Sequence, residues 1–341
     1  MELEKRKGSS MFQHFEGEEF EKWVKTANHY GRERISFVFM IDFDFKKPFI
    51  KKTTEIDPSE MLYNFNGFTN STMKNNKTNE KIVIKACPIE FEKYKAAFDY
   101  VWYNEYLGNS YLTNLTFPNR IELNTSLKDI YYRSCAKYKL WYKDQFVCFS
   151  PEIFVRIENG FISSYPMKGT IDASIENAEE LIMANEKEAA EHATIVDLIR
   201  NDLSMVSTDV RVEKYRYIDK IVTNQKNLLQ VSSKIVGKLS KNYNEKIGEI
   251  IAALLPAGSV TGAPKKKTVE IIKEAEKYDR GYYCGICGYF DGQDLDSGVM
   301  IRFIENINGE YYYKAGGGIT VYSNVESEYE ELKNKIYVPI G

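Results

Sequence analysis

The alternation of hydrophobic and polar positions divides the chain into helices and strands of ordinary length. Apolar residues spaced three to four positions apart, with charged residues between them, indicate amphipathic helices. We expect helices at 18–28, 89–107, 186–202, 246–254, 268–278 and 325–336. Alternation with a period of two indicates half-buried strands, which are predicted at 35–43, 111–149, 153–157, 161–165 and 283–313.

The order of these elements predicts the fold class and the domain organisation. Hairpins and meanders outnumber β-α-β units, so an α+β fold is favoured over a doubly wound sheet. A polar segment at 70–81 contains four Asn and three Lys and is expected to be a solvated loop. We expect an N-terminal extension of strands and a helix at 1–85 and a large catalytic unit at 86–341.

Composition and charge exclude several classes of protein. Lys and Arg total 46 against 49 Asp and Glu, a net charge of −3, which argues against a nucleic-acid-binding protein. A hydrophobic content of 43% is ample for a buried core. No apolar stretch approaches the roughly 20 residues that span a bilayer, and no signal peptide is visible. We therefore expect a cytoplasmic protein that does not bind membranes.

The five cysteines are odd in number and scattered, unlike a disulfide framework. Cys284 and Cys287 form a single C-x-x-C in a segment that alternates like a strand. A zinc site would need further ligands of this kind. Buried structural thiols are therefore the interpretation that we favour.

An acid and an amine flank a predicted hairpin on its two sides. Glu152 precedes the first arm and Lys168 follows the second. A three-residue turn ending at Gly160 would place both side chains on one face, and a two-residue turn would place them on opposite faces. The pair is either an acid and an amine aimed into one pocket or a salt bridge at the rim, worth under about 1 kcal/mol.

Two predicted helices begin with acidic pairs. Asn185 and Glu188 fit an N-cap and its capping-box partner, as do Ser323 and Glu326. Behind these caps, acidic residues recur on one helix face, as Glu188 and Glu191 in one helix and as Glu328 and Glu331, with Lys335, in the other. If the two helices face each other, their carboxylates form a set of oxygen ligands that suits Mg²⁺.

Two glycine-rich loops are expected next, and a simple tight turn is the alternative interpretation of each. The segment 255–265 precedes a helix but lacks the lysine spacing of a phosphate-binding P-loop. The segment Ala315–Ile319 is expected between a strand and a helix, where its backbone amides could hold an anion such as a carboxylate. The chain has only three histidines, and His192 is expected to pack or to hydrogen-bond on its own helix. Acid–base chemistry therefore falls to Glu, Lys and Tyr.

Taken in order, six strings in this sequence resemble the chorismate-utilising enzymes. The resemblance runs from about Tyr111 to Lys335. The strings are S-P-E (150–152), P-M-K-G-T (166–170), E-H-x-x-x-V-D-L-x-R-N-D-L (191–203), P-x-G-S-V-T-G-A-P-K (256–265), R-G-x-Y-C-G (280–285) and A-G-G-G-I (315–319). The family fold consists of antiparallel sheets packed in a sandwich and flanked by helices, with two interleaved lobes.

Within the family, the sequence resembles the aminodeoxychorismate synthases most. The discriminating position is Lys168, where anthranilate synthases typically have alanine. The resemblance implies that the Lys168 amine attacks ring carbon 2 of chorismate while the 4-hydroxyl leaves, with Glu152 as general acid. Ammonia then adds at carbon 4 and expels the lysine. Since only a neutral amine attacks, we expect the pocket to depress the pKa of Lys168.

The resemblance also implies a ligand set. It assigns Mg²⁺ to Glu191 and Glu331, with Glu188 and Glu328 as further ligands or supports. The metal would bridge to the ring carboxylate of chorismate, aided by the amides of Gly316, Gly317 and Gly318. The remaining substrate-binding positions are Thr170, Tyr283, Arg302 and Lys335.

The departures from the family pattern bear on the reaction. Leu112 replaces a glutamine, and isochorismate and salicylate synthases have a water-activating lysine at that position, so those activities are disfavoured. Leu229 replaces a histidine that lies near the ring in relatives. We find no amidotransferase cysteine motif, so ammonia is expected from a separate glutamine amidotransferase. The alternatives are anthranilate synthase component I and a catalytically idle subunit that retains the fold.

Overall fold

The structure is a computed structural model that describes residues 17–72, 81–222 and 227–340. The loop predicted at 70–81 therefore lies mostly outside the described residues. The helices, in chain order, are α1 (Glu18–Arg32), α2 (Phe91–Tyr106), α3 (Leu127–Arg133), α4 (Ala178–Ala184), α5 (Glu186–Ser204), α6 (Ile247–Leu254), α7 (Lys265–Glu276) and α8 (Val325–Asn334). Short 3₁₀ turns occur at η1 (Thr53–Glu55), η2 (Tyr243–Lys246) and η3 (Gly258–Val260).

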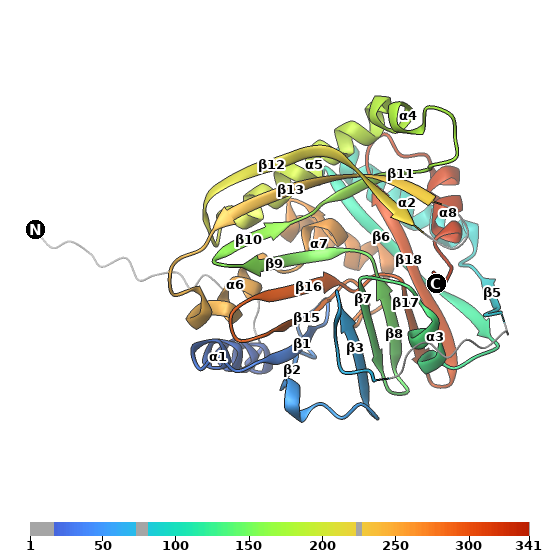
Figure 1. Cartoon of the computed structure of the whole chain (residues 1–341). Coiled ribbons are helices and arrows are strands. Elements are labelled where there is room, and N and C mark those ends of the chain that lie inside the picture. Colours follow the sequence, from blue (N-terminus) through green and yellow to red (C-terminus); the bar gives the residue numbers. More distant parts are fainter. Residues whose placement is uncertain (1–16, 73–80, 223–226, 341) are drawn as a thin grey trace, which may run out of the picture.

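Two antiparallel sheets of nine strands each, counted over the described residues, form the centre of the molecule (Figure 1). Sheet 1 consists of β1 (Phe37–Ile41), β2 (Phe49–Lys52), β9 (Ile153–Glu158), β10 (Phe161–Ser164), β11 (Met167–Asp172), β12 (Thr208–Val222), β13 (Asn227–Lys238), β15 (Ile286–Phe290) and β16 (Leu295–Val299). Sheet 2 consists of β3 (Met61–Phe65), β4 (Phe68–Thr69), β5 (Ile84–Cys87), β6 (Leu112–Leu123), β7 (Tyr138–Tyr142), β8 (Phe146–Ser150), β14 (Gly262–Ala263), β17 (Phe303–Ile307) and β18 (Glu310–Ile319). The predicted α+β sandwich is confirmed.

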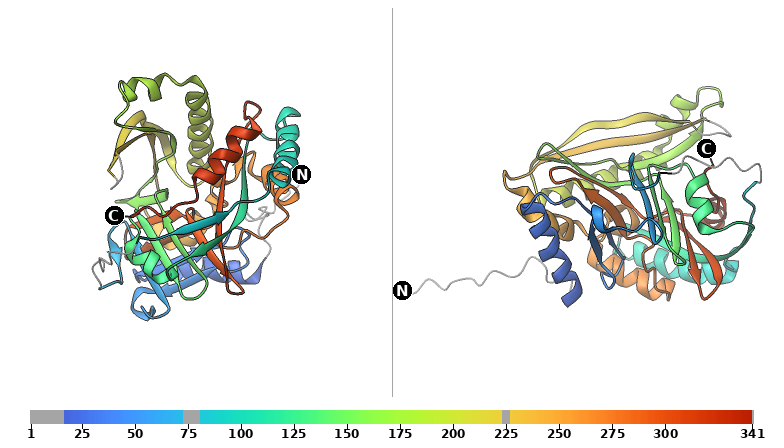
Figure 2. Two further views of the ribbon diagram at one scale, coloured as in Figure 1. Left: turned by 90° about the vertical axis from the view of Figure 1, so that its right-hand side faces the viewer. Right: turned by 60° about the horizontal axis from the view of Figure 1, so that its bottom comes forward.

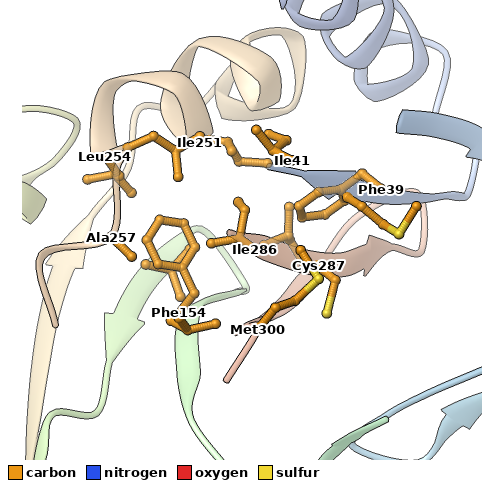
Figure 3. Packing of buried hydrophobic residues seen from close by; sticks show 14 of the residues in the cluster. Phe39, Ile41, Phe154, Ile251, Leu254, Ala257, Ile286, Cys287 and Met300 are labelled. Carbon is orange, nitrogen blue, oxygen red and sulfur yellow. The ribbon is translucent and has the colours of Figure 1, made fainter. Parts of the chain in front are cut away.

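Alternation along the strands of sheet 2 explains why both of its faces are buried. Phe146 and Cys148 point into the hydrophobic cluster shared with sheet 1, while Val147 and Phe149 point into a second cluster under the outer helices. The first cluster is completed by α1, α5 and α6, and the second by α2, α3, α7 and α8. Figure 3 shows part of the first cluster, where Ile251 and Leu254 of α6 lie close to the strands of sheet 1.

The segment before residue 85 supplies strands to both sheets. β1 pairs with β15 in sheet 1, from Phe37 opposite Phe290 to Ile41 opposite Ile286. β3 pairs with β7 in sheet 2. The division of the chain at residue 85 stays a prediction, but these pairings show that early and late segments share one hydrophobic core.

The starts of the two acidic helices test the capping predictions. The N-cap Asn185 accepts a hydrogen bond from the Glu188 backbone N–H at 3.1 Å, as predicted. The N-cap of α8 is Asn324, not Ser323, so that prediction is wrong by one residue. Asn324 accepts from the Ser327 N–H, while the Ser323 hydroxyl donates to Glu328 at 2.8 Å. An Asn side chain caps as well as a Ser, which is why the pattern alone chose the wrong residue.

No helix in the described part of the chain is both long and apolar enough to cross a membrane.

Candidate functional site

A cavity of about 290 Å³ is lined by residues of both sheets and of the helices α5 and α8. Figure 2 (left) shows these two helices. Ten of the thirteen predicted site residues line the cavity, namely Glu152, Lys168, Thr170, Tyr283, Arg302, Gly316, Gly317, Gly318, Glu331 and Lys335. The other three, Glu188, Glu191 and Glu328, are not lining residues but lie next to residues that line it. The fold therefore brings residues together that are up to 183 positions apart, from Glu152 to Lys335.

The hairpin between Glu152 and Lys168 is turned by two residues, not three. Ile157 pairs with Ile162, and the turn residues Asn159 and Gly160 both have positive φ, the pattern of a type I′ turn. A continuous hairpin with this turn would place Glu152 and Lys168 on opposite faces. Both reach the cavity because the hairpin ends at Ser164, and β11 pairs with β13 instead of continuing along β9.

Lys168 reaches the cavity from an irregular part of β11. The pairing with β13 shifts between Lys168 and Thr170, and Gly169 has a φ of +76°. Glycine suits this position because its backbone has a positive φ, and the point where it would carry a Cβ lies 3.6 Å from Glu188 of α5 and from Ile182 of α4, an ordinary contact distance. The bulge thus places Lys168 against α5.

Glu152 is a partly buried carboxyl that lines the cavity. The Ser259 hydroxyl, on η3, donates a hydrogen bond to its Oε1. Burial raises the pKa of Glu152, while the Ser259 hydrogen bond and the positive charges of Arg302 and Lys168 oppose this effect. A raised pKa is what a carboxyl needs in order to carry a proton near neutral pH and act as a general acid.

Lys168 is paired with the first acidic helix. Its Nζ donates to Glu191 Oε2 at 2.8 Å, and its side chain is 24% exposed. Burial lowers the pKa of Lys168, but Glu191, Glu188 and Glu331 together outweigh burial and raise it. The expectation of a depressed pKa is therefore wrong for the chain alone, because acids from both helices act on this one amine.

The second acidic helix has a lysine of its own. Lys335 Nζ donates to Glu331 Oε1 at 2.6 Å and to the Gly316 carbonyl at 2.8 Å. Glu328 is buried, and its Oε2 and the Lys335 Nζ each lie 3.5 Å from the point where Gly317 would carry a Cβ. The predicted face of α8, carrying Glu328, Glu331 and Lys335, is thus turned towards the glycines of β18.

The four carboxylates are chemically suited to Mg²⁺, which prefers oxygen ligands. Three of them act electrostatically on Lys168, namely Glu188 and Glu191 from α5 and Glu331 from α8. Over the residues that the structure describes, no three His, Cys, Asp or Glu side chains are grouped closely enough to form a ready-made metal site. The oxygen atoms of these carboxylates are suitable ligands for Mg²⁺. In this structure each helix has one of its carboxylates paired with a lysine, Glu191 with Lys168 and Glu331 with Lys335.

The segment Ala315–Ile319 is a strand, not the loop that was predicted. Gly316, Gly317 and Gly318 belong to β18 and pair with Thr116, Leu115 and Asn114 of β6. The pairing with β17 on the other edge ends at Lys314. One edge of β18 is thus free of strand pairing beside the cavity, and a Cβ on Gly318 would lie 3.6 Å from Lys168 Nζ and 3.0 Å from Leu112 Cδ1. Glycine here lets site side chains approach the backbone.

Arg302 and Tyr283 form the wall that joins sheet 1 to sheet 2. The Arg302 guanidinium lies over the Tyr337 ring, 5.2 Å from its centroid. Tyr283 is buried, and burial raises its pKa well above its ordinary value, so its phenol stays neutral. This wall therefore offers one permanent cation and one neutral hydroxyl to a ligand.

Several polar residues at the cavity were not singled out from the sequence. Ser259 lies within the P-x-G-S-V-T-G-A-P-K string, and Arg280 opens the R-G-x-Y-C-G string. The buried Arg280 guanidinium donates to the carbonyls of Val260 at 2.9 Å and Asn114 at 2.6 Å, and it is paired with Glu276. Arg280 thus fixes both the turn that carries Ser259 and the strand that carries Asn114. The two family-like strings that contain Ser259 and Arg280 were the only signal in the sequence for these residues.

Two further motif residues bond across elements instead of facing the ligand. Lys265 donates to Asp202 and to the Leu254 carbonyl, both at 2.8 Å, and so ties α7 to α5 and α6. His192 Nε2 lies 2.6 Å from Ser233 Oγ on β13. His192 is buried, as the packing alternative predicted, but its hydrogen bond goes to β13 and not to its own helix, because α5 packs directly on β13. Cys284 and Cys287 are buried free thiols, as expected.

The comparisons with known proteins agree with this geometry. The model of the chorismate binding enzyme family matches residues 51–341. A Haemophilus influenzae protein named "Uncharacterized PabA-like protein" is 48% identical over 97% of this chain and 98% of its own length.

Relatives with named reactions match a shorter part of the chain. Aminodeoxychorismate synthase component 1 of Bacillus subtilis is 36% identical over 57% of this chain and 42% of its own. Anthranilate synthase component 1 of Mycobacterium tuberculosis is 37% identical over 54% of this chain and 36% of its own. A putative isochorismate synthase from Bacillus anthracis shares the fold, with a TM-score of 0.68 and 19% identity over 95% of this chain and 88% of its own.

Proposed function

The chain belongs to the chorismate binding enzymes, and from this premise we propose that it aminates chorismate with ammonia to give 4-amino-4-deoxychorismate. This product is a precursor of 4-aminobenzoate and hence of folate. The proposal selects one reaction among those of the family.

The observation that carries the proposal is the Lys168 amine in the cavity. It lies beside Gly318 and acts electrostatically on Glu152, the partly buried carboxyl. Anthranilate synthases, which resemble this chain equally well in overall identity, typically have a small residue at this position. An amine at this point is a nucleophile that such enzymes lack.

The proposed chemistry uses Lys168 as the nucleophile and Glu152 as the acid. The neutral Lys168 amine forms a bond to ring carbon 2, the ring double bonds shift, and the carbon–oxygen bond at carbon 4 breaks. Glu152 gives its proton to the departing hydroxyl, which leaves as water, and the amine loses a proton. Ammonia then forms a bond to carbon 4, the double bonds shift back, and the bond between carbon 2 and the Lys168 nitrogen breaks. The new amino group loses one proton and the departing Lys168 nitrogen gains one, so Lys168 leaves as a neutral amine.

Both carboxylates of chorismate need cationic or hydrogen-bonding partners. Arg302, Tyr283 and Lys335 are suited to the enolpyruvyl carboxylate, since Arg can bind a carboxylate through two parallel hydrogen bonds. The unpaired backbone edge of β18 and the side chain of Thr170 are suited to hydrogen-bond the ring of chorismate and its carboxylate. Mg²⁺ held by Glu191 and Glu331, with Glu188 and Glu328 in support, would supply positive charge for the ring carboxylate.

Leu112 argues against the use of water as the nucleophile. It is 4% exposed and packs against Gly318, which lines the cavity. An apolar side chain at that point cannot accept a proton from water, so the chain is not suited to make isochorismate or salicylate.

The proposed reaction also needs a source of ammonia. The described histidines are His29, on the surface helix α1, and His192, which is bonded to Ser233, so a cysteine–histidine pair for glutamine hydrolysis is absent from the described residues. We propose that a separate glutamine amidotransferase delivers it.

A product assay tests this function. The purified chain is incubated with chorismate, Mg²⁺ and ammonium, with and without an added aminodeoxychorismate lyase. Formation of 4-aminobenzoate only when the lyase is present supports amination at carbon 4. Anthranilate would instead identify an anthranilate synthase, and unchanged chorismate would indicate an idle subunit.

A further inference from the structure

A group of exposed aromatic and aliphatic side chains lies on α2 and the two loops next to it. We call it the aromatic face and define it as Tyr100, Tyr103, Tyr106, Leu107, Tyr111 and Tyr322. Each of the six is at least 42% exposed, and Tyr322 reaches 81%. Isolated exposed apolar residues are ordinary, but a contiguous group of this size marks a contact surface.

The aromatic face is held in a fixed arrangement. Trp102 Nε1 donates to the Val321 carbonyl at 3.1 Å, which joins α2 to the loop that carries Tyr322. The Trp102 and Tyr106 rings are stacked with centroids 5.6 Å apart. Figure 2 (left) shows α2 beside α8 and the loop between β18 and α8. Such preorganisation lowers the entropy cost of docking a partner.

The aromatic face carries almost no charge. Residues 100–119 contain a single charged side chain, Glu105, although 28% of the whole chain is charged. Glu105 is 3% exposed, and its Oε1 accepts a hydrogen bond from Thr113 at 2.6 Å. Depletion of charge with enrichment of Tyr and Trp is the composition that distinguishes the core of a protein–protein interface.

The aromatic face is continuous with the wall of the cavity. Tyr111 precedes β6, and Tyr322 follows β18, whose residues Ile319 and Gly318 pair with Thr113 and Asn114. Asn114 and Gly318 line the cavity. Because a strand advances about 3.3 Å per residue, Tyr111 lies roughly 10 Å along β6 from the cavity wall. A protein bound here would be within a few residues of the reacting amine.

We propose that the aromatic face is the docking surface for the protein that supplies ammonia. The proposal rests on the proposed function, which requires ammonia that this chain has no described means of making. A neutral, water-excluding contact beside the cavity suits the transfer of a small neutral molecule, because ammonia lost to water would be protonated. A second copy of this chain would have no such reason to bind next to the cavity wall.

The test separates ammonia delivery from ammonia use. The full chain is mixed with each free-standing glutamine amidotransferase subunit encoded in the same genome, purified individually. Product is measured once with glutamine and once with ammonium as the nitrogen source. The variants are Tyr103→Lys, Tyr322→Lys and the two combined, none of which alters a cavity residue. The matched control is Ile307→Lys, which is also exposed but lies at the opposite end of the β17–β18 pair.

We expect the double variant to lose at least about tenfold in glutamine-dependent turnover, while ammonium-dependent turnover stays within about twofold. Ile307→Lys should change neither. Sedimentation should show a complex with one amidotransferase that the double variant weakens. Retained ammonium-dependent turnover also shows that the variants fold.

Three outcomes would overturn the proposal. Unchanged glutamine-dependent turnover in the double variant would remove the aromatic face from the ammonia route. If this chain forms dimers, and the variants dissociate them without changing glutamine-dependent turnover, the aromatic face serves self-association instead. Failure of every amidotransferase to bind or stimulate the chain would exclude the partner. Absence of ammonium-dependent turnover in the unmodified chain would instead reject the proposed function, and binding would then be judged by sedimentation alone.

Discussion

The two acidic helices present similar groups to the cavity, yet solvent reaches them differently. On α5, Glu191 is bonded to Lys168, a residue of a distant strand, and both side chains are largely buried, at 11% and 24% exposed. On α8, Glu331 is bonded to Lys335 of the same helix, and the Glu331 side chain is 54% exposed. A local, exposed pair of this kind is worth under about 1 kcal/mol, whereas a buried amine responds strongly to its surroundings.

This difference assigns different roles to the two lysines. The protonation of Lys168 depends on which charges its neighbours carry, as a nucleophile requires. The Lys335 amine instead donates a hydrogen bond to the Gly316 carbonyl and so lies beside the β18 backbone. The account therefore predicts that changes on the α5 side affect the chemical step and that changes on the α8 side affect substrate binding.

The largest effect is expected for Lys168→Ala. Loss of the nucleophile should lower kcat for 4-amino-4-deoxychorismate by at least about a hundredfold while the fold is retained. The measurement is a lyase-coupled assay with ammonium, with circular dichroism as the folding control. An unchanged kcat would exclude the covalent route.

Glu191→Gln should rank second. Replacing the carboxylate removes a proposed metal ligand and the hydrogen-bond partner of Lys168, so half-maximal turnover should need about tenfold more Mg²⁺. A Mg²⁺ titration of turnover measures this, with the exposed Glu179→Gln of α4 as the matched control. If the Mg²⁺ dependence of Glu191→Gln equals that of the unmodified chain, the ligand assignment is wrong.

Lys335→Ala should have a smaller effect of another kind. Removing one positive charge from a dianion site should raise KM for chorismate about fivefold and leave kcat within about twofold. Steady-state kinetics over a range of chorismate concentrations separate the two constants. A loss confined to kcat would contradict the division of roles between the two lysines.

The smallest effect is a shift in pH dependence for Ser259→Ala. Glu152 must carry a proton to act as an acid, so activity falls as pH rises through the pKa of Glu152. The Ser259 hydroxyl stabilises the carboxylate and lowers this pKa, while burial raises it. Removing the hydroxyl should therefore move the alkaline limb of kcat/KM to higher pH, by less than about one unit. A shift to lower pH would show that Glu152 is not the acid.

The sequence was most informative where local rules determine the structure. The helices α2, α5 and α6 follow their predicted bounds closely, because periodic burial defines them. The sequence was least informative where strands change partners. The glycines of β18 were predicted as a loop, because glycine favours turns and only the pairing with β6 explains a strand there.

The same limit applies to the cavity. The pairing of Lys168 with Glu191 depends on the departure of β11 from the hairpin, which no turn rule determines. The depressed pKa predicted for Lys168 was wrong because it considered burial without the acids of both helices. The family resemblance identified the site residues, but the electrostatic interactions among them became visible only in the tertiary structure.

Mass spectrometry of the intact protein tests the central claim most directly. The chain is mixed with chorismate and Mg²⁺ without ammonia and is quenched within the time of one turnover. The account predicts an adduct with the mass of chorismate minus one water, located on Lys168 by peptide mapping and absent from Lys168→Ala. Product formation on adding ammonia, with no adduct at Lys168 at any earlier time, would contradict it.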